Sequence, residues 1–179
     1  SRKDPAYVGL AKEIHKAQEA LMDGKDPVTV KPELAEIMDE IHVQFPQAAN
    51  DNIGFGSTIF AVKPGDGSAR EQAASCQKVL GGWANIANEY ATKRYRSNLI
   101  NWGMLPFVIP DGDLPFTNHD YLFFPGIRKA VEEKAAEITG YVVDANGLKP
   151  FTVTLGELTD EERQIILKGC LINYNRVEK

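Results

Sequence analysis

Cysteine, long apolar runs and basic charge are all scarce in this sequence. The two cysteines, Cys76 and Cys170, lie far apart, so they supply neither the close ligand spacing of a metal site nor a disulfide framework. We expect both thiols to be reduced and packed among apolar neighbours. No apolar run is long enough to span a bilayer, and no signal-peptide pattern opens the chain. These absences predict a cytoplasmic protein without membrane contact.

Acidic side chains outnumber basic ones, and the net charge is −5. This charge provides no electrostatic attraction toward nucleic acid or anionic membranes. The hydrophobic content of 43% and the length of 179 residues are those of one compact domain with a real core. The chain starts with Ser1 rather than Met, which we interpret as the sign of a piece cut from a longer protein.

The spacing of apolar residues in the first third of the chain predicts helices. Residues 5–23 and residues 32–43 each carry apolar side chains at helical spacing, and a short strand is expected between them at 28–30. Residues 46–56 are rich in Pro, Asn, Asp and Gly and are expected to form a loop. We predict that residues 1–56 are a helical extension packed on a main domain at 57–179.

The main domain alternates short β-branched runs with helix-forming segments. Three strands separated by two helices predict a parallel βαβαβ unit with right-handed crossovers. A fourth strand, a further helix, a hairpin turning at Asn146-Gly147 and a last helix capped by Thr159 are expected to follow. The expected strands are 57–62, 84–87, 104–109 and 121–124, and the expected helices between them and after them are 69–80, 89–101 and 125–138.

A turn rich in glycine and polar residues, at 65–70, joins the first expected strand to the first long helix. Its two glycines let the backbone turn sharply. Ser68 is predicted at the helix N-cap and Arg70 in the first turn, where amides, the positive helix end and a guanidinium favour a carboxylate. No Gly-Lys-Ser/Thr follows, so the turn is not a phosphate-binding P-loop. However, Ser68-x-x-Glu71 also matches a capping box, so the pattern alone leaves open that Ser68 only caps a helix in a plain α/β scaffold.

The turn resembles the C-terminal swivelling domain of the aconitase family. The similarity is carried by Gly-x-Gly-Ser-x-Arg-Glu-Gln-Ala-Ala at 65–74, followed by landmarks in the family's order at 80–82, 96–99, 102–106 and 158–173. The resemblance implies an α/β fold, namely a three-layer swivelling β/β/α domain with a mostly parallel βαβαβ core and a C-terminal β-hairpin. The N-terminal helical pair is an addition to that fold.

The resemblance also implies a function, the dehydration and rehydration of hydroxy di- or tricarboxylic acids. Ser68 matches the family's catalytic serine, an alkoxide base, and Arg70 matches its carboxylate-binding arginine. The backbone amides of Gly67 and Ala69 are expected to contact the substrate. The family commonly has a second serine where Ala69 stands and often a histidine where Gln72 stands, so the substrate stays open. Arg94, Arg96 and Asn98 lie in a shared segment, and we interpret them as surface or packing residues.

Family members hold a [4Fe-4S] cluster through closely spaced cysteines, which this chain lacks. The cluster ligands are therefore expected in N-terminal domains of the same parent protein or in a large subunit, and the chain alone is expected to be inactive. We favour a severed domain, because the Asp-x-Asp-Thr-Asp stretch of isopropylmalate-type small subunits is missing. A separately made small subunit and a non-catalytic regulatory module of the same fold are the alternatives.

Overall fold

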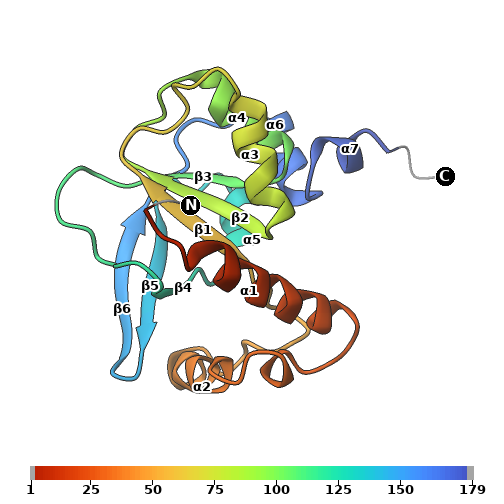
Figure 1. The fold of residues 1–179 in the computed structure, drawn as a ribbon, viewed down its shortest axis with the longest axis vertical. Helices are drawn as coiled ribbons and strands as arrows, with labels where there is room; N and C mark the ends of the chain where they lie inside the picture. Colours follow the sequence, from red (N-terminus) through yellow and green to blue (C-terminus); the bar gives the residue numbers. More distant parts are fainter. Residues whose placement is uncertain (1–2, 177–179) are drawn as a thin grey trace.

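The computed structural model describes residues 3–176 and contains two three-stranded sheets. The first sheet is parallel, with strands in the order β1 (Ser57–Ala61), β2 (Gly82–Ala87) and β3 (Leu105–Val108). The crossover helices α3 (Arg70–Val79) and α4 (Lys93–Asn101) lie side by side on one face of this sheet (Figure 1). The βαβαβ unit predicted from the sequence is confirmed, because each short apolar run forms a strand and each polar, helix-favouring stretch returns the chain.

The second sheet is antiparallel and is formed by a later part of the chain. It consists of β4 (Tyr121–Phe123), β5 (Ile138–Asp144) and β6 (Gly147–Val153), with β5 in the middle. A bridge between Val108 and Thr154 links the two sheets. Between them lies an apolar core in which the rings of Phe107 and Phe124 stack at 4.7 Å.

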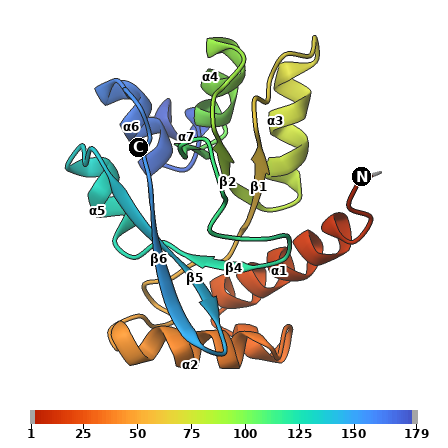
Figure 2. The same cartoon turned by 90° about the vertical axis from the view of Figure 1, so that its left-hand side faces the viewer.

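Further helices lie outside the βαβαβ unit. They are α1 (Tyr7–Met22), α2 (Leu34–Gln44), α5 (Ile127–Glu132), α6 (Asp160–Leu167) and α7 (Leu171–Tyr174). Figure 2 shows α2 lying under the hairpin of β5 and β6. There Phe45 meets the rings of Phe123 and Tyr141 edge-on at 5.3 and 5.4 Å. Residues on both sides of the expected boundary after residue 56 thus share one apolar cluster.

The predicted cap of the last long helix is confirmed. The Thr159 hydroxyl accepts a hydrogen bond from the Glu162 amide at 3.1 Å, and the Glu162 carboxylate accepts one from the Thr159 amide at 3.0 Å. This reciprocal capping box satisfies two amides that the start of a helix leaves unpaired.

Two predicted elements are wrong in kind or length. The strand expected at 28–30 is the 3-10 helix η1 (Pro27–Thr29), because the Asp26 carboxylate accepts a hydrogen bond from the Val28 amide at 3.0 Å and caps a turn there. The helix expected over 125–138 stops at Glu132. Beyond it the chain turns through Lys134, whose φ is +56°, and enters β5.

Smaller corrections concern where elements begin. The helix expected from residue 89 begins at Lys93, because the Thr92 side chain accepts a hydrogen bond from the Tyr95 amide and caps it there. The hairpin turn lies one residue earlier than expected, since Asp144 already pairs with Gly147. Within residues 3–176, no helix combines the length and apolar character needed to cross a membrane.

Candidate functional site

The turn from β1 to α3 presents the predicted site residues at the surface. Gly67, Ser68 and Ala69 are exposed, and Arg70, the first residue of α3, is half-buried. The prediction that Ser68 is the N-cap is wrong, because Ala69 holds that position with φ −91° and ψ 55°. Within the described part of the chain the Ser68 hydroxyl makes no hydrogen bond, so the capping box with Glu71 does not form. The hydroxyl is therefore free to meet a ligand.

The approach to the turn is held by the loop that precedes α4. The Val62 carbonyl accepts a hydrogen bond from the Glu89 amide at 3.1 Å, and the Pro64 carbonyl accepts one from the Ala91 amide at 2.9 Å. The Thr92 hydroxyl donates to the Gly65 carbonyl at 3.1 Å. Thr92 also caps α4, so one side chain joins the turn to the neighbouring helix.

The electrostatics at the start of α3 suit an anion. The first amides of a helix have no intrahelical acceptor and carry the positive end of the helix dipole. Among the described residues, the Arg70 Nε is buried without a hydrogen-bond partner. Within residues 3–176 no hydrogen bond or ion pair engages the rest of its guanidinium, which thus keeps donor capacity for a carboxylate that it can bind in a bidentate manner. The Glu71 carboxylate, also in the first turn, is exposed to water.

Arg96 has a structural role that the sequence left undecided between surface charge and packing. Its Nη2 donates to the Leu155 carbonyl at 3.1 Å and to the Glu157 carbonyl at 2.6 Å, while Nη1 lies 3.8 Å from the Glu162 carboxylate. Arg96 therefore ties α4 to the segment that leads into α6. Arg94 is exposed and Asn98 is half-buried, and within residues 3–176 no side-chain hydrogen bond or ion pair joins either of them to the turn.

The cysteines do not form a ligand set. Cys76 is exposed on α3, so its predicted apolar packing is wrong; the only residue that α3 buries is Ala74. Cys170 is half-buried at the start of α7. Residues 3–176 contain no group of three His, Cys, Asp or Glu side chains that could hold a metal ion. The residues present thus do not fit the iron-sulfur cluster that the resemblance implies, and no chemistry of this chain is derived through it.

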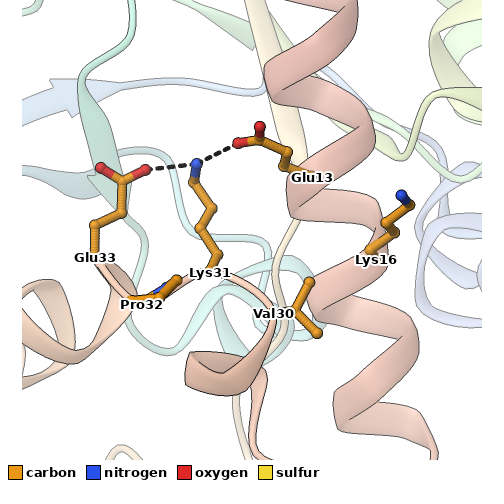
Figure 3. A pocket seen from close by; sticks show the side chains of 6 residues that line it. All are labelled: Glu13, Lys16, Val30, Lys31, Pro32 and Glu33. Carbon is orange, nitrogen blue, oxygen red and sulfur yellow. Dashed lines mark hydrogen bonds and ion pairs between the residues drawn. The ribbon is translucent and has the colours of Figure 1, made fainter.

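A hollow of about 460 Å³ lies away from the turn, beside α1 and the start of α2 (Figure 3). Lys31 is 7% exposed, and its ammonium lies 2.7 Å from the Glu13 carboxylate and 2.5 Å from that of Glu33. Glu33 also accepts a hydrogen bond from the Tyr121 hydroxyl at 2.8 Å. These groups satisfy one another and connect α1, α2 and β4, so we interpret them as structural.

The Lys31 network predicts a measurable loss of stability. We expect Lys31→Met to lower the free energy of unfolding by about 1–3 kcal/mol, because it removes a buried ammonium together with its charge-assisted hydrogen bonds to two partly exposed carboxylates. The hydrogen bonds to Lys31 and Tyr121 lower the pKa of Glu33. The stability that the ionised Glu33 carboxylate contributes is therefore present at neutral pH and is lost as acid protonates Glu33. Urea unfolding at neutral and acidic pH measures both effects.

The matched control is Lys63→Met, which breaks the exposed ion pair of Lys63 with Glu89 at 2.9 Å. An exposed pair of this kind contributes only about 0–1 kcal/mol. Equal losses for the two variants at neutral pH would contradict the structural role of Lys31.

Sequence reasoning missed the residues that hold the turn. The Thr92 side chain, at the N-cap of α4, bonds the Gly65 carbonyl. The side chains of Gln77 on α3 and Asn85 on β2 both bond the hydroxyl of Tyr95 on α4. Thr92 carries a local signal, a threonine before a helix, but it indicates only the cap. Nothing in a single sequence pairs Tyr95 with Gly65 or Asn85.

Comparison with known proteins bears on the same segment. Residues 38–112 match the family described as the aconitase C-terminal domain. This match spans less than half of the chain and includes the turn; it begins earlier than the expected resemblance, within α2, and ends before the second sheet. The crystal structure of 3-isopropylmalate dehydratase from Methanocaldococcus jannaschii is similar over 78% of this chain and 75% of that chain, with 24% sequence identity and a TM-score of 0.42. No curated protein sequence matches the chain.

Proposed function

We propose that this chain is the substrate-binding and base-bearing domain of a hydro-lyase; the match of residues 38–112 to the aconitase C-terminal domain supports this proposal. The substrate class is a hydroxy di- or tricarboxylic acid. The proposal is supported by the contacts of two side chains in the turn, which lies within the matched segment. There an exposed Ser68 hydroxyl without an intramolecular partner stands two residues before Arg70, whose Nε is unpaired among the described residues.

The roles of the turn residues follow from their chemistry. Arg70 and the backbone amides of Gly67 and Ala69 hold a substrate carboxylate, so that the neighbouring C–H bond faces Ser68. The Ser68 oxygen takes the proton from that carbon, the C=C bond forms, and the hydroxyl of the adjacent carbon leaves as hydroxide. An ionised hydroxyl is rare at neutral pH, and the helix end and guanidinium supply the positive field that stabilises it.

The domain is proposed to act with a partner that receives the hydroxide. The ligands of a [4Fe-4S] cluster would lie in N-terminal domains of the same parent protein or in a large subunit. The acidic, cysteine-poor composition supports a cytoplasmic location without a nucleic-acid partner. The upstream sequence of the parent gene, inspected for three closely spaced cysteines, distinguishes a severed domain from a separate subunit.

The test is complementation. The chain alone is expected to hydrate neither aconitate nor an isopropylmalate-type alkene, whereas the complete enzyme with its cluster-bearing portion should hydrate one of them. In the complete enzyme, Arg70→Lys should raise KM by about 10- to 100-fold, since it keeps the charge but loses the bidentate pairing worth about 1.5–3 kcal/mol.

The control for this variant is Arg94→Lys, which makes the same chemical change at an exposed position on α4. Its KM should match that of the unmodified enzyme. Turnover by the isolated chain, or equal KM values for the Arg70 and Arg94 variants, would contradict the proposed role of the turn.

A further inference from the structure

Tyr95 connects the candidate site to the sheet. It lies on α4, is 2% exposed and packs with Ala74, Leu99 and Met104. A buried tyrosine needs partners for its hydroxyl. That hydroxyl accepts a hydrogen bond from Asn85 Nδ2 at 2.7 Å.

The second partner of the hydroxyl belongs to the helix that follows the turn. Gln77 Nε2, on α3, donates to the Tyr95 hydroxyl at 3.0 Å and also to the Ala73 carbonyl at 3.0 Å. Asn85 is 1% exposed in β2, the middle strand of the parallel sheet. The hydroxyl therefore links α3 to the middle strand of the first sheet.

The ring of Tyr95 supports the other end of the turn. Gly65 has a φ of +98°, and a Cβ built on it would lie 2.4 Å from the Tyr95 Cβ and 2.5 Å from its Cγ. The Gly65 backbone thus rests directly on the base of the tyrosine. Thr92 secures this contact, because its hydroxyl donates to the Gly65 carbonyl and accepts from the Tyr95 amide.

We propose that Tyr95 is the positioning residue of the candidate site. Its ring supports the loop at Gly65, and its hydroxyl links α3 to the sheet. Ser68 and Arg70 lie between these two attachment points, so their place relative to the sheet depends on Tyr95. The inference rests on the proposed function for its catalytic consequence. Its structural part concerns only the geometry of the turn and can be tested without activity.

The variant that separates ring from hydroxyl is Tyr95→Phe. It keeps the ring that supports Gly65 and removes the hydroxyl that accepts hydrogen bonds from Gln77 and Asn85. In the complete enzyme we expect kcat to fall by about 10- to 100-fold, the effect of a small misplacement of catalytic groups, after correction for the folded fraction. Gln77→Met removes only the link to α3 and should give a similar loss that does not add to that of Tyr95→Phe.

Hydrogen exchange in the full chain gives the readout that needs no activity. The Ala73 amide reports α3 through its bond to the Ala69 carbonyl, and the Ala91 amide reports the loop through its bond to Pro64. In Tyr95→Phe the Ala73 amide should exchange about 5- to 30-fold faster, whereas the Ala91 amide should change less, because the ring that supports Gly65 is kept. Tyr121→Phe is the matched control, because its hydroxyl bonds Glu33 far from the turn and the same atom is removed.

The outcomes distinguish the two proposals. Exchange at Ala73 that is the same in both tyrosine variants overturns the positioning role, whatever the activity. Faster exchange with unchanged kcat also overturns it, since the turn would then tolerate the movement. Faster exchange combined with an inactive complete wild-type enzyme refutes the proposed hydro-lyase function and leaves Tyr95 as the support of the turn.

Discussion

Replacing Ser68 by alanine in the complete enzyme should lower kcat by about 10²- to 10⁴-fold, the usual contribution of a positioned general base. KM should change little, because the hydroxyl acts mainly in the transition state. Stability should also change little, since the Ser68 hydroxyl is exposed and makes no hydrogen bond within residues 3–176. Steady-state hydration kinetics and thermal unfolding of the same preparation measure all three quantities.

The control for Ser68 lies on the helix that follows the turn. Ser75 donates a hydrogen bond to the Gln72 carbonyl at 3.3 Å and is not part of the proposed site. Ser75→Ala should leave kcat unchanged, so it measures the effect of removing a hydroxyl from α3. A Ser68→Ala enzyme as active as Ser75→Ala would disprove the base, and a fully active Ser68→Asp enzyme would do the same.

The sequence predicted the location of the site better than its local geometry. A strand followed by glycines, a serine and a helix signal placed Ser68 and Arg70 correctly at the strand-to-helix turn. The capping box was a reasonable prediction from Ser68-x-x-Glu71, yet the helix begins later. The loop is held instead by long-range bonds to residues 89–92, and these contacts leave no mark on the local pattern.

In the fold, too, the elements set by local sequence were predictable, and those set by distant contacts were not. The parallel sheet was predictable because each strand is a short apolar run bounded by glycine or polar residues. The end of α5 was not, because Ile138 fits a helical pattern but pairs with Val153 across the hairpin. Cys76 was misplaced for a related reason. Its helix buries little, since Ala74 is the one residue of α3 that is fully buried.

The largest structural effect is expected for Gly65→Ala. The new Cβ would fall 2.4 to 2.7 Å from three atoms of the Tyr95 side chain, and φ at this position is +98°. Tyr95 is buried and bonded to Asn85 and Gln77, so it has no room to withdraw. We expect a loss of about 2–5 kcal/mol in the free energy of unfolding from the overlap and the strained backbone together. Urea unfolding of the full chain measures it.

Gly67→Ala is the matched control, made two residues further along the same turn. A Cβ there meets no atom within 4 Å, and its φ lies outside the left-handed region. Its stability should stay within about 1 kcal/mol of the original, because alanine also reduces the freedom of the unfolded chain. Equal stability of the two alanine variants would show that Gly65 does not rest on Tyr95. A selective loss at Gly65 would instead support the close contact on which the position of Ser68 and Arg70 depends.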